Sequence, residues 1–509
     1  MLPYLTQTQN PSKKYSVAFR GLNYGEGTLD GEFAETRNLS TDKYPCITQR
    51  AERTRVGQYP LPLTLHSKGE LLVIDGGNVL YAGEKVGEVA YDKNNPKRHQ
   101  TATVGNYIVI FPDKKYYNVE TKEFKSMEET YEAKGLVFDK STITTTGDDF
   151  PFKEGDGVEI SGCSNNANNK SIIIRGVESK KLTFYDNSFT AGTEAGTVKI
   201  VRKIPDLDFV CENNYRLWGT KGNTIYSSKF SDPLNFNVFD GLSSDSYYID
   251  VGSDGEFTGC MPYSSHICFF KENTLHKLYG TKPSNFQITT ANVYGVQKGS
   301  ERSMQIVNEQ LLYKGVGGVY AYTGGVPELI SDKFGNKRFT DAVACCDGEK
   351  YYISMKQGEQ CSLYCYDVMR NIWLREDETD AVDMAFHDGK VYFLDARGGL
   401  YYIDKEADRS NIEWEAVFCT INETIYERKG YSKFQLRMDL DEGAWLAVDI
   451  KTDTNPVWNQ VYTTHNAKAK TVSIPIMPTR CDSVDIRLRG KGVCTIKTFL
   501  REFTVGSDV

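Results

Sequence analysis

The densest group of side chains that could do acid–base chemistry is the run Arg375-Glu376-Asp377-Glu378-Thr379-Asp380. Two carboxyl groups held at a fixed separation can hydrolyse a glycosidic bond, one acting as the acid and the other as the base or nucleophile. The run lies between two apolar segments, so we interpret it as an inter-strand loop. A solvated charged turn is the more common outcome for such a loop, and we predict no catalytic role for it.

Other motifs that could support catalysis lack the required spacing. The Gly-rich segment 315–325 is followed neither by Gly-Lys-Ser/Thr nor by a helical pattern, so hairpin glycines explain it better than a phosphate-binding loop does. Ser253-Asp254-Gly255 lacks the tryptophan of a sialidase turn, and the sequence contains no Gly-x-Ser-x-Gly nucleophile elbow. We therefore predict that the protein is not an enzyme.

Side chains that could ligate a metal are scattered along the chain. Cys361 and Cys365 could form one metal pair, but no second Cys or His pair lies nearby. The twelve cysteines show no regular framework, which favours buried free thiols in a reducing compartment. The histidines have no metal-ligand spacing; they are His66, His99, His266, His276, His387 and His465. We predict no catalytic, cofactor-binding or metal site, and no cofactor.

The elements that hold these residues are predicted to be strands. The 509 residues include 32 Tyr, 25 Phe and 44 Gly, a composition that favours pleated surfaces and tight turns. Apolar residues occur in short runs that alternate with polar ones, as in 434–440 and 484–489, which is the period of a strand. We expect an all-β protein.

A short apolar strand, a Gly- or Asn-centred turn and a second strand with an aromatic residue recur along the chain. The seven copies are 72–84, 107–119, 216–228, 267–280, 311–325, 350–367 and 390–404. From Ile225 to Leu400 the copies are 50, 44, 44 and 37 residues apart, close to one four-stranded propeller blade. We predict a β-propeller of about seven blades, because such sheets must pack around an axis to bury both faces. Phe230, Phe236 and Phe239, which follow one hairpin, are expected to pack between blades.

Two segments depart from this rhythm. Residues 133–203 carry strands of their own and are predicted to form a small β-barrel inserted between blades. Residues 420–509 continue as alternating strands without the blade pattern, which indicates a C-terminal β-sandwich. The remaining divisions are an extended N-terminal lead-in (1–56) and two propeller parts (57–132 and 204–419).

Charge is unevenly distributed. Residues 1–420 carry 47 Lys/Arg and 57 Asp/Glu, net −10, whereas residues 421–509 carry 13 and 11, net +2. A negative body argues against tight binding of nucleic acid through its phosphates. Asp75, Asp113, Asp254, Asp347 and Asp395 lie in the blade turns. They could face a channel, or they could be ordinary turn aspartates that accept hydrogen bonds from backbone amides.

The N-terminal sixteen residues have no uninterrupted apolar core, and no later stretch approaches the roughly 18 apolar residues of a membrane span. We expect a protein that is not secreted by the general route and has no membrane span.

Three segments resemble the tail-hub proteins of short-tailed bacteriophages, also called nozzle or packaged-DNA stabilisation proteins. They are "YPCITQRAERTRV" (44–56), "VGSDGEFTGCMPYSSHICFFKENTLHKLYG" (251–280) and "GVQKGSERSMQIVNEQLLYKG" (295–315). The best-marked pieces are Pro45, Ile47-Thr48 and Arg50 in the lead-in, and Val296-Gln297-Lys298-Gly299, which opens a blade. Cys46 stands where the family is expected to have glycine. The similarity extends in order along nearly the whole chain.

The resemblance implies a non-catalytic virion protein: a β-propeller hub, six copies of which form a ring below the portal and adaptor and close the channel over packaged DNA. Its implied partners are further copies of itself in a hexamer, the portal and adaptor, and tail fibre or needle proteins, while DNA passes without tight binding. The implied location is the virion tail, assembled in the host bacterial cytoplasm. Two alternatives remain open: a glycan-binding or glycan-cleaving propeller, and an intracellular scaffold of the kelch or WD type.

Overall fold

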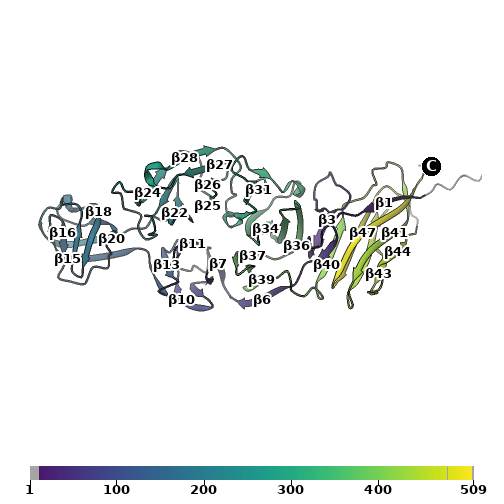
Figure 1. The fold of residues 1–509 in the computed structure, drawn as a ribbon, viewed down its shortest axis with the longest axis horizontal. Coiled ribbons are helices and arrows are strands. Elements are labelled where there is room, and N and C mark those ends of the chain that lie inside the picture. Colours follow the sequence, from purple (N-terminus) through teal and green to yellow (C-terminus); the bar gives the residue numbers. More distant parts are fainter. Residues whose placement is uncertain (1–10, 478–479, 507–509) are drawn as a thin grey trace, which may run out of the picture. The chain divides into compact units, whose positions relative to one another are not determined.

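The computed structural model describes residues 11–477 and 480–506, so most of the N-terminal sixteen-residue segment discussed above lies outside the described residues. Strands make up nearly all of the regular structure, and the helices of the described part are single 3-10 turns (Figure 1). None of the helices in that part is long and apolar enough to cross a membrane. The all-β prediction is confirmed.

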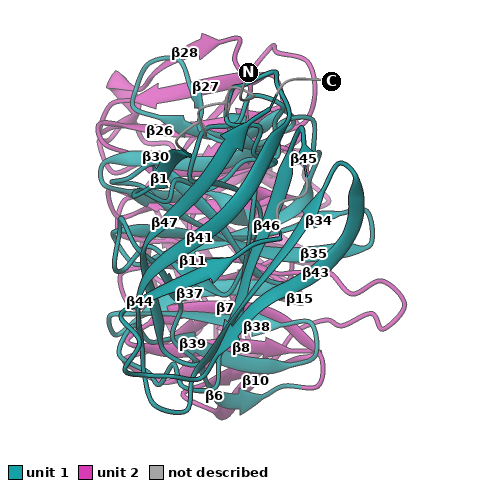
Figure 2. Cartoon of the chain, turned by 90° about the vertical axis from the view of Figure 1, so that its right-hand side faces the viewer, with its two compact units in different colours: residues 1–59, 302–509 teal, residues 60–301 magenta. Residues whose placement is uncertain are grey.

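The chain divides into two compact units (Figure 2). Unit 1 contains residues 1–59 and 302–509, and unit 2 contains residues 60–301. Each unit contains several four-stranded antiparallel sheets together with one further β structure.

Unit 2 contains four such sheets, each a meander of strands that are consecutive in the chain. The first consists of β7 (Pro62–Lys68), β8 (Glu70–Asp75), β9 (Asn78–Tyr81) and β10 (Glu84–Glu88), and the second of β11 (Gln100–Val104), β12 (Tyr107–Phe111), β13 (Lys115–Asn118) and β14 (Glu123–Ser126). The third consists of β21 (Phe209–Asn213), β22 (Arg216–Lys221), β23 (Thr224–Ser227) and β24 (Tyr247–Asp250), and the fourth of β25 (Gly259–Tyr263), β26 (His266–Lys271), β27 (Thr274–Tyr279) and β28 (Gln287–Ala291).

Unit 1 contains three more four-stranded sheets. Their strands are β29 (Gln305–Val307), β30 (Gln310–Gly315), β31 (Gly318–Tyr322) and β32 (Glu328–Leu329); β33 (Thr340–Cys346), β34 (Lys350–Gln357), β35 (Gln360–Asp367) and β36 (Ile372–Asp377); and β37 (Ala381–His387), β38 (Lys390–Asp395), β39 (Gly399–Ile403) and β6 (Arg53–Gln58). In the last sheet the edge strand β6 precedes all the others in the chain.

The seven predicted strand–turn–strand segments are the central hairpins of these seven sheets. The pairs are β8–β9, β12–β13, β22–β23, β26–β27, β30–β31, β34–β35 and β38–β39. The turn between β22 and β23 contains Gly222 at φ +58°, a left-handed backbone conformation that glycine adopts without a steric cost. Trp373 of β36 lies in a core shared with β30 and β31, and its indole N–H donates to the Ile330 carbonyl at 2.8 Å.

Six strands of unit 2 close into a barrel. They are β15 (Glu129–Asp139), β16 (Thr142–Thr144), β17 (Gly157–Ser161), β18 (Ser171–Glu178), β19 (Lys181–Phe184) and β20 (Gly192–Arg202). The barrel is filled by its own apolar cluster, which includes Leu136, Ile143 and Ile174. Its base is tied to the rest of unit 2 through Asp156, which pairs with Arg202 at 2.9 Å and accepts from the Asn235 amide at 3.1 Å.

The further β structure of unit 1 has two sheets. The seven-stranded sheet contains β1 (Ser12–Ser16), β4 (Leu39–Ser40), β5 (Ile47–Gln49), β41 (Lys429–Leu440), β44 (Thr471–Pro475), β45 (Arg480–Cys481) and β47 (Cys494–Val505). The six-stranded sheet contains β2 (Gly21–Leu22), β3 (Glu32–Arg37), β40 (Glu413–Phe418), β42 (Trp445–Thr452), β43 (Asn455–Thr464) and β46 (Val484–Lys491). Apolar residues of β41, β42 and β46 belong to one core, so the two sheets face each other.

Strands from both ends of the chain build this structure. The predicted lead-in, 1–56, supplies β1 to β5 to the two sheets and β6 to a four-stranded sheet, and β40 falls within the segment 204–419 that was predicted as propeller. In β1 and β47, Ser12 pairs with Phe503. A local pattern of residues cannot show such a pairing, because strand partners are chosen by hydrogen bonding between segments that can be far apart in the chain.

Candidate functional site

The connection between β23 and β24, residues 228–246, is folded around a buried arginine. Arg216 of β22 is 1% exposed, and its guanidinium donates to the carbonyl oxygens of Ser228 (2.8 Å), Asp245 (2.6 Å) and Ser243 (2.8 Å). Arginine suits this role because its planar fork carries several donors at fixed angles. Burial lowers the pKa of Arg216, and the charge of the nearby Asp245 carboxylate offsets part of this lowering. The guanidinium therefore fixes the course of a connection that leaves the sheet.

The aromatic residues of this connection are in two different environments. Phe236 is buried in the core shared with β12 and β22, as predicted. The same prediction is wrong for Phe230 and Phe239, which are 46% and 52% exposed. Phe230 instead contacts Tyr215, and Phe239 contacts Tyr248 of β24, each pair edge to face.

A cavity of about 540 Å³ lies beside Phe239, between residues 239–248 and 282–284 of unit 2. Phe239 and Tyr248 line it, with ring centroids 5.7 Å apart and planes inclined at 80°. Tyr248 is 58% exposed and Leu242 is 59% exposed. Lys282 completes the charged lining. Large apolar side chains gathered around a concave surface are typical of a binding site.

Asp245 lines the same cavity although it is only 4% exposed. One carboxylate oxygen, Oδ2, accepts from the backbone amides of Gly241 (2.7 Å) and Leu242 (3.0 Å). The other, Oδ1, is buried and has no hydrogen-bond partner in the part of the chain that the structure describes. An acceptor left in this state costs free energy unless a donor reaches it. Asp245 thus brings an acceptor without a partner to the lining of the cavity.

Neither Asp245 nor Arg216 belongs to a catalytic or metal-binding motif in the sequence. The available signal was a charged residue, Arg216, at the start of an otherwise apolar strand, "RLWGT". A buried cation needs partners, so this position predicts a set of acceptors nearby. The sequence does not say which acceptors they are.

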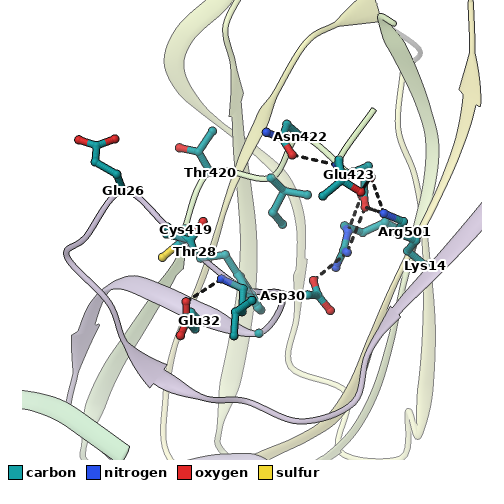
Figure 3. A pocket seen from close by; sticks show the side chains of 16 residues that line it. Lys14, Glu26, Thr28, Asp30, Glu32, Cys419, Thr420, Asn422, Glu423 and Arg501 are labelled. Atoms are coloured by element: carbon teal, nitrogen blue, oxygen red, sulfur yellow. Dashed lines mark hydrogen bonds and ion pairs between the residues drawn. The ribbon is translucent and has the colours of Figure 1, made fainter. Parts of the chain in front are cut away.

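A second cavity, of about 330 Å³ in unit 1, surrounds Arg501 of β47 (Figure 3). Arg501 is 1% exposed; its Nε lies 2.7 Å from Glu423 Oε1 and its Nη2 lies 2.8 Å from Asp30 Oδ1. Its third nitrogen, Nη1, donates to Ser16 Oγ at 2.6 Å. Burial would lower the pKa of Arg501, but the hydrogen bond to Glu423 and the two carboxylate charges raise it above the ordinary value.

Glu32 lines the same cavity and is also fully occupied by donors. Its oxygens accept from the Leu29 amide (2.7 Å), the Asn23 side chain (2.6 Å) and the Lys333 ammonium (3.0 Å). Burial raises the pKa of Glu32, but these three donors outweigh burial and the net pKa is lowered. The cavity around Arg501 is thus a set of satisfied ion pairs that hold β1, β3 and β47 together.

The prediction that residues 375–380 form a solvated loop is wrong in part, because Glu376 and Asp377 are the last residues of strand β36. Both carboxylates pair with Arg53 of β6, at 2.6 and 2.8 Å, and Asp377 also pairs with Arg50 at 3.2 Å. Burial raises the pKa of Asp377, and the charges of Arg53 and Arg50 lower it to below the ordinary range. These residues join β6 to β36, and the cations that neutralise them come from a segment more than 320 residues away in the chain.

Two of the five turn aspartates accept hydrogen bonds from amides of their own turns, as the turn interpretation predicts: Asp347 from Lys350 (2.7 Å) and Asp395 from Gly399 (2.7 Å). Asp75 and Asp113 accept from amides farther away in the chain, those of Leu61 (2.6 Å) and Ala90 (2.6 Å). Asp254 is exposed. Orientation of these residues toward a channel stays a prediction.

The cysteine and histidine side chains make contacts that are common in the interior and on the surface of a folded protein. All twelve cysteines are free, and burial raises the pKa of Cys361 to about 11. Ser253 Oγ lies 2.7 Å from His276 Nε2, and burial lowers the pKa of His276 to about 4. The other histidine contacts are His66 with Thr103, His99 with Asp113, His266 with Tyr279 and His387 with Tyr392, while His465 is exposed. Across residues 11–477 and 480–506, no three His, Cys, Asp or Glu side chains are grouped to hold a metal ion.

Comparison with known proteins gives no family. No family model and no curated protein matches the chain. Among solved structures, BamB from Moraxella catarrhalis is 10% identical over 70% of this chain and 98% of its own, with a TM-score of 0.36. The computationally designed Ika8 protein is 12% identical (68% and 99% covered, TM-score 0.31), and the phage phi92 endosialidase is 11% identical (72% and 68% covered, TM-score 0.27). Similarities at this level carry no argument about what the chain does.

Proposed function

We propose that the chain is the tail hub, or nozzle, of a short-tailed bacteriophage: a non-catalytic virion protein that stabilises packaged DNA. In this proposal the seven four-stranded sheets are the blades of one β-propeller, into which the barrel is inserted and to which the two-sheet structure of unit 1 is joined. Six copies form a ring below the portal and adaptor, close the channel, and carry tail fibre or needle proteins. Assembly takes place in the cytoplasm of the host bacterium.

The observation that carries the proposal is the structural role of the residues behind the family resemblance. Ile47 and Thr48 place β5 beside β47, and Arg50 pairs with Asp377 at the end of β36. Farther along, Val296 is fully buried, and Gly299 has φ +81°, which favours glycine. Ile47, Thr48 and Arg50 thus join elements that are distant in the chain. This is the role expected of a protein whose work is to hold a shape within an assembly.

The closure of the last four-stranded sheet also supports the propeller. In that sheet β6 pairs with β39, so its outer strand comes from the segment just before β7. A strand borrowed from the start of a circular array is how such an array avoids leaving a free edge at its seam.

Mass photometry and negative-stain imaging of the purified chain, alone and with portal and adaptor, test the proposal. We expect a six-fold ring that joins the portal complex. A protein that is strictly monomeric at micromolar concentration and joins no tail complex would overturn it.

Binding to DNA gives a second test. We expect no measurable affinity for double-stranded DNA at physiological salt, because residues 1–420 carry a net charge of −10. Sub-micromolar binding in a mobility-shift titration would contradict this and would favour a clamp formed by the residues beyond 420.

One alternative has an observation of its own. The cavity beside Phe239 and Tyr248 has the composition of a ligand site. It favours binding of a small molecule over a purely architectural surface in this part of unit 2, whether or not the chain is a hub.

A further inference from the structure

We propose that the cavity lined by residues 239–248 and 282–284 binds a pyranose saccharide. Tyr248 and Phe239 provide ring surface for the apolar face of the sugar, and Asp245 Oδ1 accepts a hydrogen bond from one of its hydroxyl groups. The site lies within unit 2 and does not depend on the hub proposal.

The aromatic residues supply the first reason. Tyr248 and Phe239 are more than half exposed, as is Leu242, and all three line one cavity. Aromatic rings left in water at a concave surface lose the free energy that burial would provide, and such patches mark binding sites. A ligand that covers them must present an apolar face.

Asp245 supplies the second, independent reason. Its Oδ1 atom is buried without a hydrogen-bond partner among the described residues, in a side chain that lines the cavity. An entirely apolar ligand would leave this acceptor unsatisfied, at a cost in affinity. The ligand must therefore carry a hydrogen-bond donor as well as an apolar face.

The cavity lining carries one charge of each sign, Asp245 and Lys282. An anion such as a phosphate is attracted by Lys282 and repelled by Asp245, and the reverse holds for a cation, so neither sign of charge is favoured by both residues. A neutral sugar suits both residues, because its hydroxyl groups can donate to Asp245 and accept from Lys282. Its C–H face can lie against Tyr248 or Phe239.

The position of Asp245 is fixed before any ligand binds. Its carbonyl accepts from Arg216, and its Oδ2 accepts from the Gly241 and Leu242 amides. These three contacts therefore hold in place Oδ1, the oxygen that has no partner. A pre-positioned acceptor spares the ligand the entropic cost of ordering the site.

The test uses the purified full chain on a glycan array of bacterial surface saccharides, followed by saturation-transfer NMR. The NMR probes are glucose, galactose, rhamnose and N-acetylglucosamine at millimolar concentration, together with the best array ligand. Tyr248→Ala removes one ring. Asp245→Asn keeps an acceptor for the Gly241 and Leu242 amides but turns an NH₂ group toward the cavity. Tyr185→Ala, a tyrosine on the barrel that is 60% exposed, is the matched control.

We expect the wild-type chain to bind at least one saccharide, and the Tyr248→Ala and Asp245→Asn variants to bind it about tenfold or more weakly. The Tyr185→Ala variant should bind like wild type. Circular dichroism and melting curves should show that all three variants are folded.

Three results would overturn the proposal, two from the binding assays and one from the oligomeric state. One is the absence of saccharide binding by the wild-type chain in both assays. Another is binding that neither cavity variant weakens. If Tyr248→Ala instead changes the oligomeric state of the chain, the patch is a contact between copies and the saccharide site is rejected. Formation of the six-fold ring is measured in a separate experiment. If the hub proposal fails, the saccharide-binding results can therefore still be interpreted.

Discussion

In the cavity around Arg501, the carboxylates of Asp30, Glu32 and Glu423 each accept from a cation or a backbone amide, whereas in the cavity beside Tyr248 one oxygen of Asp245 has no hydrogen-bond partner among the described residues. A buried arginine organises the surroundings of each cavity: Arg501 lines the first cavity, and Arg216 binds the backbone of the connection that forms part of the second. In the first cavity the hydrogen bonding is completed within the chain. In the second it is incomplete, and exposed aromatic rings surround it.

The two cavities thus differ in whether their buried polar atoms have hydrogen-bond partners. We use this criterion to distinguish a structural cluster from a binding site. A cluster whose donors and acceptors are matched contributes to stability, so its loss should appear in unfolding experiments. A site with an unmatched acceptor should show its effect in ligand binding instead. Four substitutions test this contrast, and they are given from the largest expected loss of stability to the smallest.

Arg501→Met should have the largest effect on stability. It leaves Glu423 buried without its cation, and removing one partner of a buried pair costs about 3–5 kcal/mol. Urea unfolding followed by tryptophan fluorescence measures the loss, and hydrogen exchange in β1 and β47 localises it. The double variant Arg501→Met/Glu423→Gln should recover part of the loss. An unchanged unfolding midpoint would show that the pair is not structural.

Arg216→Met should have the next largest effect. Three carbonyl oxygens lose a charged donor, which we expect to lower the free energy of unfolding by about 2–3 kcal/mol. Hydrogen exchange should accelerate in residues 228–246, and saccharide binding should be lost with it because Asp245 is no longer held. Arg175→Met, which changes an exposed arginine of the barrel, is the control. Equal exchange rates in the two variants would contradict the role of Arg216.

Glu32→Gln tests the pH dependence of the satisfied cavity. The folded-state pKa of Glu32 is lowered below its unfolded value, so the carboxylate contributes stability above the unfolded pKa and this contribution is lost as the pH falls through the folded pKa. We expect the variant to lose about 1 kcal/mol at neutral pH. Below about pH 4 its melting temperature should converge on that of wild type. Melting curves at a series of pH values measure this, and parallel profiles would be the contrary result.

Asp245→Asn should have the smallest effect on stability. The asparagine oxygen can still accept from Gly241 and Leu242, and no partner of Oδ1 is lost, so we expect a change below about 0.5 kcal/mol. Differential scanning calorimetry measures the change. A large destabilisation would mean that the second carboxylate oxygen is used within the fold, and the contrast between the two cavities would then fail.

Local patterns were sufficient for the strands and hairpins. In residues 434–440 and 484–489 the buried and more exposed positions alternate as the sequence indicates. The Gly-rich segment 315–325 forms the hairpin of β30 and β31. These features follow from side-chain alternation and turn residues, which act over a few positions.

Local patterns could not predict which charged residues pair with each other, or which strands pair at the edges of the sheets. The acidic run at 375–380 was interpreted as a solvated loop because it lies between two apolar segments. In the structure Arg53 neutralises Glu376 across 323 residues. Likewise, residues 1–56 were predicted as an extended lead-in, whereas β1 and β5 of this segment pair with β47 near the other end of the chain.

The sequence by itself thus determined that the chain is all-β and where its seven central hairpins lie, because alternation and turn chemistry are short-range properties. The tertiary structure alone decided which charges are matched, which of three neighbouring phenylalanines is buried, and that Asp245 keeps an open acceptor. Desolvation and hydrogen-bond satisfaction depend on every group within a few ångströms in space. Most of those groups are distant in the chain, so no spacing of residues encodes them directly.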